Sequence, residues 1–178
     1  MFLYRVDKRD FKPTEEIVPS TNYNNSLIGL TLEVENKLNE VKPKNTPCRN
    51  ECLFLFYNLS SALLFSSKYG GNIYVVKVVK KEDCYHRADM NIADSILKFF
   101  KVTTDEQTRN DIARWYWEAG SHTFLPCYEV LVSKATVIEK ILDNSQRPNA
   151  NLGYQDIERT DIFFKLLQRV KELEATQS

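Results

Sequence analysis

The chain has 178 residues, and its 24 basic side chains balance 24 acidic ones, so that its formal net charge is zero. This length suits one compact domain, and hydrophobic and charged contents of 43% and 27% are typical of a globular protein rather than a disordered or fibrous one. The neutral balance excludes a global attraction to nucleic acid or to an anionic membrane, so any nucleic-acid binding has to come from a local patch.

The N-terminal part predicts a strand followed by a helix. Phe2–Val6 alternate in polarity, and the charged, proline-containing stretch Asp7–Pro13 ends the predicted strand. A polar loop, Pro19–Ser26, precedes Leu27–Val41, where apolar residues recur at helical spacing. The chain opens without the basic and apolar segments of a secretory signal and has no apolar run of about 18 residues, so we expect a cytoplasmic protein with no membrane contact.

The middle part predicts a strand, a helix and a second strand. Cys52–Tyr57 is a short continuous apolar run, as expected of a buried strand. Asn58 is a typical cap for a helix over Leu59–Tyr69, and Gly70-Gly71 supply the left-handed residues that end it. Ile73–Val79 is the most strongly β-prone run in the chain.

The C-terminal half predicts mostly helical structure around one or two strands. His86–Asp89 mix both charge signs and indicate a loop, and Asn91–Ala119 carry apolar residues at helical spacing. Cys127–Val132 predict a strand, whereas Ala135–Leu142 fit either a strand or a short helix. An amphipathic helix is predicted at the C-terminus, over about residues 155–175.

Four cysteines, Cys48, Cys52, Cys84 and Cys127, are too sparse for a secreted disulfide scaffold, so we interpret them as reduced thiols. A zinc site is an alternative, because the first three thiolates and His86 would complete a tetrahedral set. The spacing C-x3-C followed by C-x-H is not a usual zinc signature, so we expect no metal.

Three stretches carry the residues that suggest chemistry. They are Leu3–Asp7 with Arg5, Leu53–Phe65 with Tyr57 and Asn58, and Tyr128–Val132 with Glu129. Their order resembles the three-part signature of the mono-ADP-ribosyltransferases, in which an arginine begins the fold, a middle strand leads into a helix, and a late strand carries a glutamate. The resemblance spans residues 2–142 and implies a single α+β domain, residues 1–178, with a split β core flanked by helices.

The resemblance implies that the protein is an enzyme that cleaves NAD as a co-substrate. Glu129 would be its catalytic carboxylate, since breaking the bond to nicotinamide develops positive charge on the ribose. Arg5 would bind the NAD diphosphate or the neighbouring ribose, and Tyr57 would stack on nicotinamide. Asn58 and Ser60 would complete the cofactor-binding set at the start of the predicted helix.

Two departures from the family pattern bear on the acceptor of ADP-ribose. Phe56-Tyr57-Asn58 stand where many members have Ser-Thr-Ser, and Cys127 stands where arginine-modifying members carry Glu or Gln. We therefore expect an acceptor other than arginine, either a nucleic acid or another protein side chain. Trp115, which could stack on bases, and His86 and Arg87, which could contact phosphate, favour RNA or DNA over protein.

The small size resembles compact members of bacteria and phages that act as toxins or in phage defence, which would bring an antitoxin protein as a partner. Two alternatives stay open. One is an NAD glycohydrolase, in which water replaces the macromolecular acceptor. The other is a non-catalytic binding or immunity module of the same fold, in which Arg5, Tyr57 and Glu129 are structural.

Overall fold

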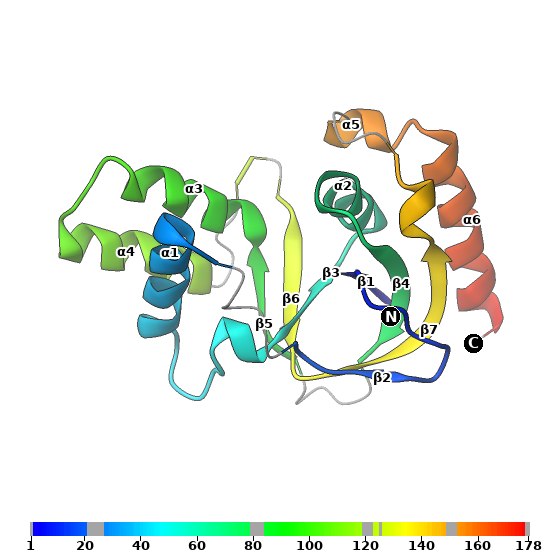
Figure 1. Ribbon diagram of the computed structural model, residues 1–178, viewed down its shortest axis with the longest axis horizontal. Helices are drawn as coiled ribbons and strands as arrows, with labels where there is room; N and C mark the ends of the chain where they lie inside the picture. The colour runs from blue at the N-terminus through cyan, green and yellow to red at the C-terminus, as the bar shows by residue number, and fades with distance from the viewer. Residues whose placement is uncertain are drawn as a thin grey trace. The chain divides into compact units, whose positions relative to one another are not determined.

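The computed structural model describes residues 2–20, 27–78, 84–118, 123–124, 126–148 and 153–176. The chain groups into two compact units: unit 1 comprises Met1–Ile17, Leu55–Val79 and Ala135–Ser178, and unit 2 comprises Val18–Phe54 and Lys80–Lys134. The α+β class expected from the sequence is confirmed, with strands that pair antiparallel (Figure 1). The single domain and the split core of an ADP-ribosyltransferase stay predictions.

Unit 1 is built on antiparallel strands in the order β2-β7-β4-β1-β3. The strands are β1 (Leu3–Asp7), β2 (Glu16–Ile17), β3 (Leu53–Phe56), which crosses the unit boundary after Phe54, β4 (Asn72–Lys77) and β7 (Ala135–Leu142). The predicted strands at the N-terminus and before Val79 are confirmed, although Val79 itself lies outside the described residues. Ala135–Leu142 form a strand rather than a helix, because they pair along β4.

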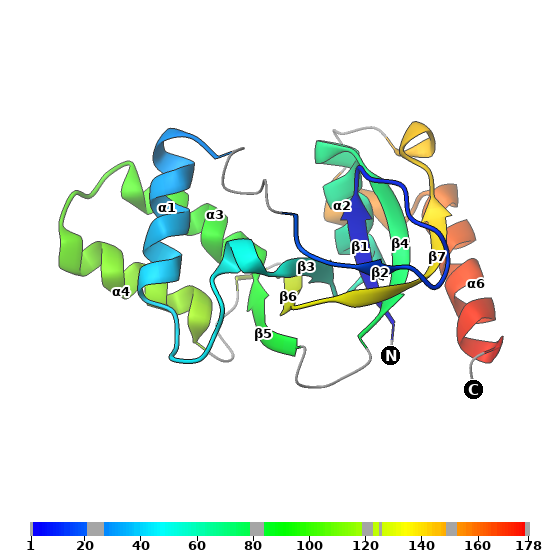
Figure 2. The same cartoon turned by 60° about the horizontal axis from the view of Figure 1, so that its bottom comes forward.

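The helices of unit 1 are α2 (Leu59–Tyr69), α5 (Tyr154–Ile157) and α6 (Asp161–Thr176). Helix α2 packs against β1 and β4, and α6 runs alongside β7 in both views (Figures 1 and 2). The single C-terminal helix expected from the sequence is wrong in one respect, since it is divided into α5 and α6. The Thr160 hydroxyl accepts a hydrogen bond from the Phe163 amide at 3.2 Å, and this cap starts a new helix.

In its described residues, unit 2 combines a pair of antiparallel strands with three α-helices and a short 3-10 turn. Its elements are α1 (Gly29–Glu40), η2 (Arg49–Glu51), β5 (Cys84–Asp89), α3 (Met90–Phe100), α4 (Glu106–Trp117) and β6 (Tyr128–Val132). The loop expected at His86–Asp89 is wrong, because these residues pair with β6 and form part of β5. Helix α1 lies across α3 and α4 in Figures 1 and 2.

The mostly helical stretch expected from Asn91 onward is confirmed as far as Trp117, and it consists of two helices, α3 and α4. Asp105 caps α4 by accepting from the Thr108 amide at 2.8 Å. The buried carboxylate of Asp89 caps α3 through the Asn91 amide and also accepts from the amides of Thr123 and Cys127. Ala119 lies outside the described residues.

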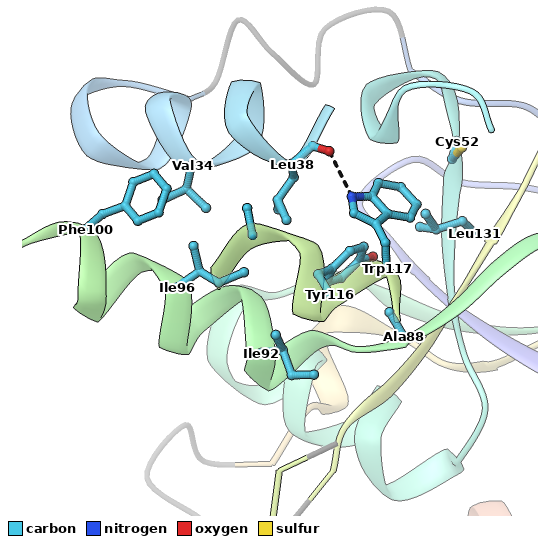
Figure 3. Close-up of a cluster of buried hydrophobic side chains, with 11 residues drawn as sticks. Val34, Leu38, Cys52, Ala88, Ile92, Ile96, Phe100, Tyr116, Trp117 and Leu131 are labelled. Atoms are coloured by element: carbon cyan, nitrogen blue, oxygen red, sulfur yellow. Dashed lines mark hydrogen bonds between the residues drawn. The ribbon is translucent and has the colours of Figure 1, made fainter. Parts of the chain in front are cut away.

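One hydrophobic cluster holds the helices of unit 2 against its strand pair, β5 and β6 (Figure 3). It joins Val34 and Leu38 of α1, Ile92, Ile96 and Phe100 of α3, Ala113, Tyr116 and Trp117 of α4, and Cys52, Ala88 and Leu131. The Trp117 indole donates to the Leu38 carbonyl at 2.8 Å, which satisfies the polar atom of a buried ring. No helix in the described ranges is both long enough and apolar enough to cross a membrane.

Candidate functional site

Glu129 lies on β6 opposite Ala88 of β5, and its side chain is only 2% exposed. Its Oε1 accepts one hydrogen bond from Nη1 of Arg49 at 2.8 Å and another from the hydroxyl of Tyr116. Both bonds end on the same oxygen, and neither uses Oε2. The predicted catalytic carboxylate is therefore held rigidly through one oxygen inside unit 2, rather than facing solvent by strand alternation.

Arg49, at the start of η2, is the centre of this buried network. Its Nε donates to the two carboxylate oxygens of Glu35 at 3.1 and 3.2 Å. Its guanidinium also lies over two rings, 4.8 Å from the centroid of Phe54 and 4.3 Å from that of Tyr116. One guanidinium therefore serves the carboxylates of both Glu35 and Glu129.

Tyr116 and His86 extend the network toward β5. Burial raises the pKa of the Tyr116 hydroxyl well above its usual value; the Arg49 charge opposes this, and the Glu129 charge adds to it. The hydroxyl therefore stays protonated and donates to Glu129. Nε2 of His86 lies 3.0 Å from the Tyr116 carbonyl, and burial lowers the pKa of this imidazole. The His86 ring packs 5.0 Å from that of Trp117.

Arg5 lies in the middle of β1 and forms an ion triad with Asp7 and Arg9. Nε and Nη2 of Arg5 donate to Oδ2 of Asp7 at 3.0 and 2.8 Å, and Arg9 binds both oxygens of the same carboxylate. Burial acts to raise the pKa of Asp7, but the hydrogen bonds from Arg9 and the charge of Arg5 outweigh it and lower that pKa to about 2.

Acid should therefore remove the contribution of Asp7 to stability. The pKa of Asp7 is about 2 in the folded state, against 3.8 for the unconstrained group, so ionised Asp7 stabilises the fold by about 2 kcal/mol above pH 4. This contribution to the free energy of unfolding is lost as the pH falls toward 2. Urea unfolding of wild type and Asp7→Asn from pH 6 to 2 tests this. We expect the gap between them to close in acid, while Asp111→Asn, an exposed control, stays near wild type throughout. A gap that is constant with pH would contradict the prediction.

Tyr57, Asn58 and Ser60 surround the start of α2. Tyr57 and Asn58 are half-buried, and Ser60 is buried in the first turn. Asn58 occupies the N-cap position as expected, but its side chain makes no capping hydrogen bond. These three residues and Arg5 belong to unit 1, whereas Glu129, His86, Arg87 and Trp115 belong to unit 2. The convergence of the two sets on one NAD molecule stays a prediction.

Arg87 and Trp115, the other two residues predicted to contact the acceptor, are exposed. The Arg87 guanidinium stacks 4.3 Å from the ring centroid of Tyr128. Trp115 is 48% exposed and meets Phe99 edge to face, with ring centroids 6.4 Å apart.

The cysteines give little support to thiolate chemistry. Burial raises the pKa of the Cys52 thiol to about 12, so this side chain is a protonated, apolar member of the core. Within the described ranges, no three side chains of His, Cys, Asp or Glu gather closely enough to hold a metal ion.

Arg49 is the residue that the sequence interpretation missed. Arginine is common on protein surfaces, and nothing in the stretch Cys48–Glu51 marks this one as buried. Its position depends on Glu35, Glu129 and Tyr116, which come from three other segments of the chain. Comparison of the chain with protein-family models and with curated proteins finds no match.

Proposed function

We propose that the chain is an NAD-dependent mono-ADP-ribosyltransferase that modifies a macromolecule other than at arginine, with Glu129 as its catalytic carboxylate. The observation that carries the proposal is the anchoring of Glu129 through Oε1 alone. A carboxylate that is fixed through one oxygen presents the other in a constant position, and such preorganisation costs no rearrangement as charge develops.

The charge of the network supports the same role. Cleavage of NAD develops positive charge on the ribose, and a cluster in which two carboxylates share one guanidinium favours that charge more strongly in a buried setting than in water. Since Glu129 is 2% exposed, contact between NAD and Oε2 requires the surrounding side chains to open.

The remaining roles are those that the resemblance implies. Arg5 would bind the diphosphate, because a planar guanidinium matches the oxygens of a phosphate group. Tyr57 would stack on nicotinamide, with Asn58 and Ser60 beside it at the start of α2. A toxin or phage-defence role, restrained by an antitoxin protein, is part of the same proposal.

Incubation with adenine-labelled NAD and cell lysate tests the proposal. We expect label on one macromolecular fraction, and a loss of about 100-fold or more in Glu129→Gln, because the amide keeps the acceptor oxygen but removes the charge. Glu139→Gln, which alters an exposed ion pair with Arg169, should label normally. Thermal melting of all three proteins separates a catalytic effect from unfolding.

Other outcomes would favour the alternatives. Label only in free ADP-ribose would indicate an NAD glycohydrolase. A second candidate function, a non-catalytic binding or immunity module, is favoured by the burial of Glu129 and the exposure of Trp115. Intact NAD after incubation with folded wild-type protein would rule out the enzyme and leave this module.

A further inference from the structure

Strand β5 presents a second group of side chains that the Glu129 network does not use. Ala88 of β5 and Glu129 of β6 lie opposite each other and face the helical core. Arg87 precedes Ala88 and Tyr128 precedes Glu129, so the alternation of side chains along a strand points both of them to the other face of this strand pair. Their stacking, with 4.3 Å between the guanidinium carbon and the ring centroid, agrees with this.

Tyr85, two residues before Arg87 in the same strand, carries a second aromatic ring. The pairing of β5 with β6 shifts register between Cys84 and His86, so Tyr85 is the extra residue of a β-bulge. Its side chain is 38% exposed, and Arg87 is exposed as well. In the described ranges β5 pairs with β6 alone, so its other edge is not covered by a strand.

We propose that Tyr85, Arg87 and Tyr128 form a binding site for single-stranded nucleic acid. An arginine already stacked on a tyrosine has its plane fixed, so it can bind a phosphate and extend the stack to a base at a small entropic cost. Aromatic rings on a sheet bind the faces of unpaired bases, which a duplex does not offer; here the ring of Tyr85 is exposed and that of Tyr128 is half-buried. An acidic peptide would use Arg87 but would gain nothing from the two rings.

This inference makes the proposed function more specific, because it takes single-stranded nucleic acid to be the acceptor of ADP-ribose. In that one respect it rests on the proposed function. The binding itself needs no NAD. Because the net charge of the chain is zero, we expect weak binding, with a Kd on the order of 10⁻⁵ M at low salt.

Fluorescence anisotropy of the full chain with a labelled RNA of about 12 nucleotides, and with the matching DNA, tests the site without NAD. We expect Tyr85→Leu and Arg87→Ala each to weaken binding about 10-fold, the loss typical of one stacked base. Arg87→Ala should also lower the slope of log K against log salt by about 0.7, the value for one phosphate contact on a single strand. Arg87→Lys keeps the charge, so it should weaken binding while it preserves that slope.

Phe164→Leu on α6 and Arg114→Ala on α4 change exposed side chains; they are the controls and should stay within about 2-fold of wild type. An effect of Phe164→Leu equal to that of Tyr85→Leu would overturn the site, and so would an absence of binding by wild type. Displacement of the RNA by hexaglutamate at equal concentration would assign the surface to acidic peptides instead. Consumption of NAD without RNA binding would leave the proposed function standing and remove only this inference.

Discussion

Replacement of Arg49 by methionine should lower the free energy of unfolding by about 3–5 kcal/mol, because the carboxylates of Glu35 and Glu129 would remain buried without their counter-charge. Methionine fills a similar volume between the rings of Phe54 and Tyr116, so the loss measures charge more than packing. Urea unfolding at pH 7, followed by circular dichroism, measures the change.

Two further variants separate this explanation from a general intolerance of mutation. Arg114→Met removes an arginine that is about half exposed, and we expect a change of at most about 0.5 kcal/mol. Arg49→Met combined with Glu35→Gln and Glu129→Gln removes all three charges and should recover most of the lost stability, since a neutral cluster has no unpaired ion. A triple variant as unstable as Arg49→Met alone would show that the charges are not the cause.

Gly71→Ala should destabilise the fold by about 3 kcal/mol. Gly71 joins α2 to β4 with φ of 119°, a conformation that residues with a side chain rarely adopt. An added Cβ would also lie 2.9 Å from Cγ1 of Val6 and 3.2 Å from the Asp7 carbonyl, so β1 would have to shift. Strain and collision thus act together at the point where α2 turns back into the sheet.

Gly29→Ala is the matched control for this prediction. Gly29 also has a positive φ, 56°, but a Cβ there would meet no atom within 4 Å. Its replacement therefore adds backbone strain alone, about 1 kcal/mol. Equal losses for the two alanine variants in chemical denaturation would show that the contacts with Val6 and Asp7 do not matter.

The sequence predicted best the elements whose signals are local. Helix α2 begins at Leu59 and ends at Tyr69, as expected, because Asn58 and the two glycines mark its ends within the sequence itself. Strand β5 was missed because its charged residues form a strand only through pairing with β6, which lies far along the chain. Asp105 and Thr160 start new helices, and as capping residues they offered a local signal that the hydrophobic pattern concealed.

The residues of the candidate site also differ in whether a local signal in the sequence could identify them. Glu129 could be selected from the sequence because a carboxylate in an otherwise apolar strand is unusual. Its partners could not, since Glu35, Arg49 and Tyr116 meet only after α1, η2 and α4 have packed. For Arg5, the sequence placed the residue on a strand but gave no sign that Asp7 would hold it together with Arg9.

The order of strands in unit 1 has a consequence for synthesis on the ribosome. Strand β4 lies between β1, which is made before it, and β7, which is made much later. Until β7 emerges, one edge of β4 has no partner, and its sequence Asn72–Lys77 is apolar and strongly β-prone. A nascent chain would thus expose an aggregation-prone edge while residues Lys80–Lys134 of unit 2 are translated. A chaperone that binds during synthesis would therefore protect the chain most in that interval.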